Sequence, residues 1–308
     1  MAEHDKMLGS FELITPLTNQ DSGFSVWGFA RRSGMDYFVK QHLKPIYPAG
    51  DTVLSQERIQ RKIVQCKKFE QEKTKLYQAL NEHSDGNAVR IQEFFRVGSH
   101  YYLATNKING IHLEIEEIAN MQWEKKRFLC ATISHAVASF HEGGVVHADL
   151  KHTNIMFVNG RTGNLIAKVI DFDSSFLETA PPNPGEEIVG DQVYFSPEAC
   201  RSIWGEAMPL TCKMDIFSLG ILFHQYLIGT LPSYSDKFYY PGEAVANGEI
   251  LQVSEYISEP YRALVQNMLE ADPEKRPSAD QVFCVFSKTE SGAPVQNFDH
   301  QFFAPGDL

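Results

Sequence analysis

The sequence predicts an α+β protein with two lobes: a small, mostly antiparallel β lobe with one long helix, and a larger, mainly helical lobe. Residues 11–40 are rich in aromatic and β-branched side chains and carry turn signals, as short strands do. Residues 55–80 have the composition of one long helix, with many charged residues and good helix formers. At 308 residues the chain suits one large domain or two lobes.

The expected domain organisation has four parts. We expect a leader at residues 1–10, the small lobe at 11–106, the large lobe at 107–288 and a tail at 289–308. The tail contains three phenylalanines, and aromatic side chains in a tail usually dock on a protein surface. The tail and the long helix are therefore candidate surfaces for a regulatory partner.

Composition excludes several classes of protein. The net charge of −11 disfavours nucleic-acid binding, which usually needs a basic surface. No apolar run approaches the roughly 20 residues that span a bilayer, so we expect no membrane segment. Five scattered cysteines without a C-x-x-C pair, behind a polar N-terminus, indicate reduced thiols in a cytoplasmic protein.

The small lobe is expected to contain five strands. Turn signals at residues 19–23 and at Ser33-Gly34 divide residues 11–40 into three strands. Residues 90–95 and 101–106 form two more apolar runs after the long helix.

The large lobe is expected to begin with a helix over residues 124–140, whose apolar side chains recur at helical spacing. A hairpin follows, with strands at 155–158 and 165–170 and a turn at Asn159-Gly160. Residues 174–192 contain several prolines and acids and are expected to form a loop.

Polar residues flank the predicted hairpin at both ends. The stretch His147-Ala-Asp-Leu-Lys-His-Thr-Asn154 precedes it, and Asp171-Phe172-Asp173 follows it. The hairpin would bring Asp149, Asn154 and Asp171 to one edge. Phosphoryl transfer uses such a set: one carboxylate orients the attacking hydroxyl, while an amide and a second carboxylate hold magnesium.

This pattern resembles the protein kinase family, whose motifs are H-R-D-L-K-x-x-N and D-F-G. Here the motifs are H-A-D-L-K-x-x-N and D-F-D, with Ala148 replacing the family's arginine. The chain is identified as a member of the eukaryotic-like Ser/Thr protein kinase family, of the type without that arginine. Lys151 favours Ser/Thr over tyrosine kinases. The order of the motifs implies the bilobal kinase fold.

The resemblance implies a role for each of these residues. Asp149 would act as the base, and Lys151 would bind the γ-phosphate. Asn154 and Asp171 would hold Mg²⁺. ATP would be the phosphate donor, and a Ser or Thr hydroxyl of a protein substrate would be the acceptor.

The family's V-A-I-K motif is matched by Tyr37-Phe-Val-Lys40. Lys40 would hold the α- and β-phosphates, with Glu72 of the long helix as its partner and Glu70 as the alternative. Phe38 stands where the family has a small alanine facing adenine, so Phe38 and Trp27 could crowd the base.

The loop over the ATP phosphates is degenerate. Gln20, Ser22 and Ser25 stand at the glycine positions, with Gly23 displaced by one and Phe24 at the tip.

The segment between the lobes also matches the family. Thr105 would guard the back of the nucleotide pocket, and the backbone groups of Asn106 and Ile108 would meet adenine. Met156 completes the expected nucleotide-binding set.

Other matches imply structural roles. His147 would brace Phe172, and Asp215 would bind the backbone of the catalytic loop. Arg276 would form a buried bidentate ion pair with Glu198.

Two alternatives stay open. A pseudokinase scaffold is favoured by the lost glycines and by Phe38 and Trp27. A small-molecule kinase of the aminoglycoside or choline type is favoured by the D-F-D motif, although Asp215 and Arg276 are typical of the protein-kinase large lobe.

Regulation is expected to be unusual. Ala148 offers no guanidinium to capture a phosphate on the activation segment. Asp191 could instead bind Lys151 and hold the segment, so the enzyme is expected to be active without activation-segment phosphorylation.

Overall fold

The computed structural model describes residues 7–19, 25–48, 55–84, 86–160 and 163–288. The chain divides into two compact units, described separately below: residues 1–81 with 89–109, and residues 82–88 with 110–308. The change of unit after residue 109 lies close to Asn106, the expected end of the small lobe. No sequence pattern predicted that residues 82–88 group with the second unit.

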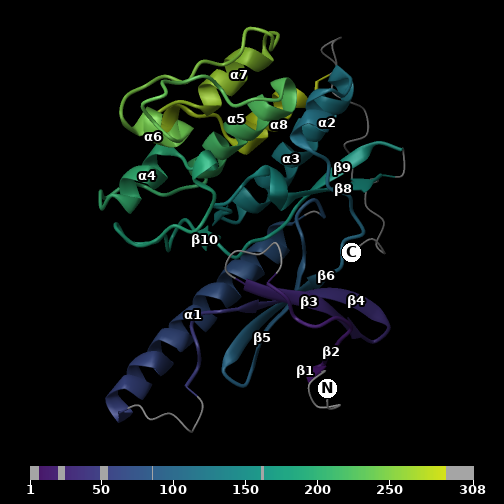
Figure 1. The fold of residues 1–308 in the computed structure, drawn as a ribbon, viewed down its shortest axis with the longest axis vertical. Helices are drawn as coiled ribbons and strands as arrows, with labels where there is room; N and C mark the ends of the chain where they lie inside the picture. Colours follow the sequence, from purple (N-terminus) through teal and green to yellow (C-terminus); the bar gives the residue numbers. More distant parts are fainter. Residues whose placement is uncertain (1–6, 20–24, 49–54, 85, 161–162, 289–308) are drawn as a thin grey trace. The chain divides into compact units, whose positions relative to one another are not determined.

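The first unit contains an antiparallel sheet of six strands in the order β1-β2-β3-β4-β6-β5 (Figure 1). The strands are β1 (Met7–Leu8), β2 (Phe11–Leu13), β3 (Ser25–Arg32), β4 (Met35–His42), β5 (Ile91–Val97) and β6 (His100–Asn106). The expected turn at Ser33-Gly34 joins β3 to β4, and both of its residues have positive φ angles, as a two-residue hairpin turn requires.

Strand β1 lies in the segment that the sequence analysis took for a leader. Leu8 pairs with Phe11 of β2 and is buried in the same apolar cluster, which lies on one side of the sheet. Burial of the Leu8 side chain stabilises the pairing of residues 7–8 with β2.

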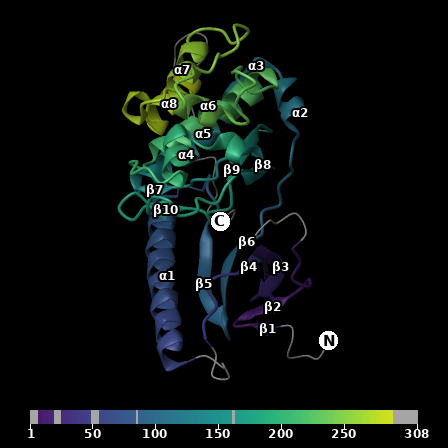
Figure 2. The ribbon, with the colours of Figure 1, turned by 60° about the vertical axis from the view of Figure 1, so that its left-hand side comes forward.

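The helix α1 (Gln56–His83) runs beside β5 in both views (Figures 1 and 2). Aromatic rings join it to the sheet: Phe69 packs edge-on against His42, Phe94 and Tyr101. At its end, the side chain of Asn81 exchanges two hydrogen bonds with the backbone of Ile91, at 2.7 and 2.9 Å. These contacts fix the rotation of α1 about its axis against the strands.

The second unit is mainly helical. Its helices are α2 (Ile115–Ala119), α3 (Trp123–Glu142), α4 (Pro197–Ile203), α5 (Lys213–Ile228), α6 (Pro241–Ala246), α7 (Tyr261–Met268) and α8 (Ala279–Phe286). Helix α5 is buried along nearly its whole length and ends at Gly229, whose φ of 94° suits glycine. Because α5 is central, its side chains can anchor loops around it.

Two short ribbons complete the second unit. The expected hairpin is β8 (Ile155–Asn159) with β9 (Leu165–Val169), and a smaller ribbon pairs β7 (Val145–Val146) with β10 (Phe176–Leu177). The stretch between β7 and β8 is therefore held at both ends. Across the described ranges, no helix has both the length and the apolar character needed to cross a bilayer.

Candidate active site

The loop from His147 to Asn154 is anchored on Asp215 of α5, as expected. The backbone N–H groups of His147 and Ala148 donate to the Asp215 carboxylate at 2.7 and 2.9 Å. Nε2 of His141, at the end of α3, lies 2.9 Å from the same carboxylate. Ala148 has a φ of 65°, which costs a non-glycine residue roughly 1–2 kcal/mol. The hydrogen bonds to Asp215 offset that cost and hold the next residue, Asp149, in place.

The Asp149 carboxylate is held by three donors. Nζ of Lys151 and Nδ2 of Asn154 lie 2.9 and 3.0 Å from Oδ2. The backbone N–H of Asp191 donates to Oδ1 at 2.9 Å. The side chain keeps 12% of its surface exposed, so the carboxylate is oriented and still reachable.

Asn154 and Asp171 lie at the same end of the β8–β9 hairpin. The Asn154 amide donates to both the backbone and the side chain of Asp149, which leaves its Oδ1 as an oxygen ligand. Its carbonyl accepts the N–H of Ile170, which brings the following Asp171 to the same edge. An amide oxygen and a carboxylate are ligands that Mg²⁺ accepts, with phosphate oxygens and water completing the shell. The donor set therefore fits Mg²⁺, and no group of three or more His, Cys, Asp or Glu residues in the described ranges forms another metal site.

His147 is a structural histidine, as expected. Its ring packs 4.7 Å from that of Phe172, and its Nε2 lies 3.1 Å from the carbonyl oxygen of Ile170. Phe172 is fully enclosed and also meets Phe140 edge-on. These ring contacts hold Phe172, and with it the backbone directly after Asp171, in place.

The contact between His152 and Tyr226 was not expected from the sequence. Nδ1 of His152 lies 3.0 Å from the Tyr226 hydroxyl of α5, and burial lowers the pKa of His152. Tyr226 is buried, which raises its pKa well above the usual value. The pair connects the catalytic loop to α5 at the residue that follows Lys151. No sequence signal joins two residues 74 positions apart.

The activation segment, residues 174–192, is mostly a loop, as expected, but it includes the short strand β10. Its contacts differ from the expected pairing of Asp191 with Lys151. The Asp191 carboxylate accepts the N–H of Val193, while Lys151 pairs with Asp149. A side chain that can bond to a backbone N–H two positions ahead forms a local turn without a distant partner. The contact that joins the segment to the catalytic loop comes instead from the Asp191 backbone.

Two other contacts hold the segment. The Ser175 hydroxyl donates to the carbonyl oxygen of His147 at 3.0 Å, and the Glu178 carboxylate accepts the N–H of Cys212. Beyond the segment, Arg276 forms the expected bidentate pair with Glu198, at 2.7 and 2.8 Å, with both side chains buried.

In the first unit, Lys40 and Phe38 lie on one face of the sheet. Lys40 stands opposite Trp27 and Leu103, and Phe38 stands opposite Phe29 and Thr105. The Phe38 ring stacks on Trp27 with centroids 5.5 Å apart and meets Phe29 edge-on. Three aromatic rings therefore cover this face beside Lys40, where the sequence analysis expected two.

The other residues expected to bind the nucleotide are placed as follows. Ser25 is buried and opens β3, whereas Ser22, Gly23 and Phe24 lie outside the described residues. Thr105 is buried, Asn106 ends β6 and Ile108 follows it; Met156 is half-buried on β8 of the second unit.

Glu72 does not pair with Lys40, contrary to the expectation. It is 52% exposed and its carboxylate lies 3.6 Å from Lys68, one turn back on α1. The alternative, Glu70, accepts the Tyr101 hydroxyl at 2.7 Å. The buried residues of α1, among them Cys66, Leu76 and Leu80, form a stripe along one side of the helix. Because each residue turns the helix by about 100°, Glu72 lies roughly a quarter turn from the centre of this stripe, whereas Lys73 lies on it. The F-x-x-E pattern therefore selected the wrong helix position.

Comparison with known proteins gives the family. The model of the protein kinase domain matches residues 50–285. Calcium-dependent protein kinase 13 of Arabidopsis thaliana is 30% identical over 254 residues, covering 76% of this chain and 46% of that protein. Serine/threonine-protein kinase PSK2 of Saccharomyces cerevisiae is 25% identical over 211 residues, covering 66% of this chain and 18% of that protein.

The chain spans about half the length, or less, of the curated relatives that it matches. Calcium-dependent protein kinase 10 of Arabidopsis thaliana, 25% identical, aligns with 87% of this chain. The matched region contains the loop from His147 to Asn154, Asp171, Asp215 and the Glu198–Arg276 bridge. The chain therefore belongs to the eukaryotic-like Ser/Thr branch of the protein kinase family.

Proposed function

We propose that this chain transfers the γ-phosphoryl group of ATP to Ser and Thr hydroxyls of a protein substrate, with Asp149 as the base. The observation that carries the proposal is the orientation of the Asp149 carboxylate by Lys151, Asn154 and the Asp191 N–H. A held carboxylate at a partly exposed position can orient a hydroxyl and accept its proton. The names of the relatives, which are protein kinases, support the same reaction.

The transfer makes one bond and breaks one. The substrate oxygen attacks the γ-phosphorus, its proton passes to Asp149, and the bond to the leaving ADP oxygen breaks. Lys151 places an ammonium beside the base, where negative charge on the transferred group can be stabilised. Lys40 is the residue of the first unit that we assign to the α- and β-phosphates.

Bound Mg²⁺ would neutralise charge on the phosphates, with Asn154 and Asp171 as its protein ligands. Ser25, Phe38, Thr105, Asn106, Ile108 and Met156 stay our candidates for contact with the nucleotide. We place the activity in the cytoplasm, because all five cysteines are free thiols.

A pseudokinase scaffold is the second candidate. The rings of Trp27, Phe29 and Phe38 beside Lys40 favour it, because they reduce the room for an adenine base.

Radiolabelled ATP separates these functions. The wild type should label a mixed protein substrate in the presence of Mg²⁺, and Asp171→Ala should not. Labelling of an aminoglycoside or choline in place of protein would favour a small-molecule kinase. No labelling of any acceptor, together with unchanged folding, would overturn the proposal and leave the scaffold.

A further inference from the structure

The end of the activation segment lies directly on the catalytic carboxylate. The Asp191 N–H donates to Oδ1 of Asp149 at 2.9 Å, and Gly190 precedes it. A Cβ atom at Gly190 would lie 3.2 Å from Oδ1 of Asp149 and 2.6 Å from Cε1 of Phe195. Only glycine allows the backbone to come this close, so a small shift of the segment would break the hydrogen bond.

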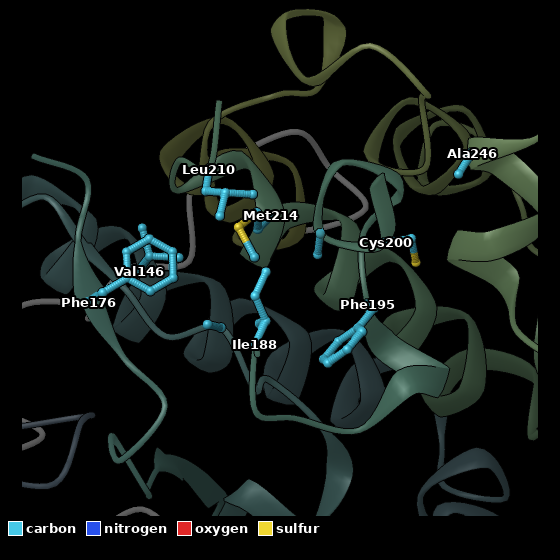
Figure 3. Packing of buried hydrophobic residues seen from close by; sticks show 10 residues of the cluster. Val146, Phe176, Ile188, Phe195, Cys200, Leu210, Met214 and Ala246 are labelled. Atoms are coloured by element: carbon cyan, nitrogen blue, oxygen red, sulfur yellow. The ribbon is translucent and has the colours of Figure 1, made fainter. Parts of the chain in front are cut away.

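An apolar contact holds the segment at this point. Ile188, two residues before Gly190, is 6% exposed and lies in the middle of a buried cluster (Figure 3). Its members come from β7, the catalytic loop, β10, the activation segment and α4 to α6: Val146, Ala148, Phe176, Ile188, Phe195, Ala199, Cys200, Leu210, Met214 and Ala246. The cluster thus joins Val146 and Ala148, which precede Asp149, to the segment.

Ala148, which stands where the family motif H-R-D has its arginine, is part of this cluster. Ala148 immediately precedes Asp149, is buried, and presents only a methyl group. Near Ile188 the chain carries the acids Glu186 and Glu187, which would repel a phosphate group. The segment is therefore held at Ile188 by burial of apolar surface.

We propose that Ile188 is a positioning residue for phosphoryl transfer. Its buried side chain holds the Gly190–Asp191 backbone against Asp149, so the activation segment takes its working conformation without a phosphate. The inference rests on the proposed kinase function and names how its site is assembled.

The experiment compares Ile188→Ala with the conservative Ile188→Val and with Val189→Ala as the matched control. Val189 is the next residue and is 42% exposed. All proteins are treated with phosphatase before kcat and the KM for ATP are measured. Ile188→Ala should lower kcat by about tenfold or more, roughly 1.4 kcal/mol in the barrier, with the KM for ATP unchanged. Ile188→Val and Val189→Ala should stay within about twofold of the wild type.

A second variant and a second readout cover the case of poor folding. Gly190→Ala keeps Ile188 but adds the clashing Cβ, so it should lower kcat in the same way. Hydrogen exchange at the Asp191 amide should be slow in the wild type and in Ile188→Val, and fast in Ile188→Ala.

Two results would overturn the inference. One is a kcat of Ile188→Ala near the wild-type value, and the other is an Asp191 amide that exchanges at the same rate in the wild type and in Ile188→Ala. If the wild type transfers no phosphate, the proposed function fails. The exchange rates then still decide whether Ile188 positions the segment.

Discussion

At the scale of single residues, Asp215 shows how a buried charge can organise a loop. Its carboxylate is fully enclosed, and it accepts two backbone hydrogen bonds while lying beside the His141 ring. An enclosed carboxylate without such partners would be strongly destabilising. The arrangement fixes the backbone on which Asp149 stands, so the orientation of Asp149 starts at a residue that never meets a substrate.

Replacement of Phe38 should change the affinity for nucleotide. The Phe38 ring stacks on Trp27 on the face that carries Lys40. Phe38→Ala removes that ring and should lower the Kd for ATP severalfold, or widen the range of nucleotides bound. Titration calorimetry with Mg²⁺ measures the change. Met35→Ala, at an exposed position of the same strand, is the control. An equal or weaker affinity of Phe38→Ala would show that the ring does not crowd the base.

At the scale of elements, the activation segment is attached by contacts that need no modification. Ser175 is buried with its hydroxyl on His147, Glu178 binds the backbone of Cys212, and Ile188 is enclosed. Phosphate on Ser175 would have to displace a buried hydrogen bond, so we expect no regulation through Ser175.

The exposed or half-exposed hydroxyls of the segment are Ser174 and Thr179. Because the anchors lie elsewhere, the double variant Ser174→Ala, Thr179→Ala should keep kcat within about twofold of the wild type. Phosphatase treatment should leave both proteins unchanged. A fall of tenfold or more, about 1.4 kcal/mol in the barrier, would mean that a basic side chain reads a phosphate there.

At the scale of the whole molecule, the sequence predicted the elements better than their contacts. The five expected strands of the first unit, α1, α3 and the hairpin after the catalytic loop appear within a few residues of their expected bounds, whereas β1 was not expected. Their patterns are local, because turns, β-branched runs and helical spacing are set by neighbouring residues. The Asp215 anchor and the Glu198–Arg276 bridge were also predictable, since the family's motifs carry them.

The misses share a physical cause. The direction in which the Glu72 side chain points depends on the rotation of α1 about its axis. That rotation is set by Phe69 and Tyr77, which pack on strands far along the chain. His152 meets Tyr226, and Ile188 meets Ala148, only after α5 and the activation segment are in place. Such contacts follow from tertiary packing and leave no periodic signal in the sequence.

The stability of the second unit should fall in mild acid. Nδ1 of His224 lies 2.7 Å from the Thr230 carbonyl oxygen, the Ser254 N–H points to Nε2 at 3.1 Å, and burial lowers the pKa of this histidine. As the pH falls through about 6.5, His224 takes up a proton in the unfolded chain but stays neutral in the folded protein. The free energy of unfolding therefore decreases. At higher pH both states are neutral and the loss is absent.

Thermal melts between about pH 7.5 and about pH 5 test this linkage. The Tm of the wild type should fall, and His224→Gln should show a shallower fall because one titrating group is gone. The exposed His112 provides the control, because His112→Gln should behave as the wild type. Identical pH profiles for all three proteins would contradict the assignment.

The most direct test of the central claim is phosphoamino-acid analysis of labelled protein substrate, comparing the wild type with Asp149→Asn. The wild type should place the γ-phosphate on serine and threonine. Asp149→Asn should lower kcat by about 10²–10⁴-fold, the usual cost of losing a general base, with ATP affinity and Tm unchanged. Undiminished phosphoserine and phosphothreonine from Asp149→Asn would contradict the role of Asp149. Label on small molecules only would contradict the assignment of a protein substrate.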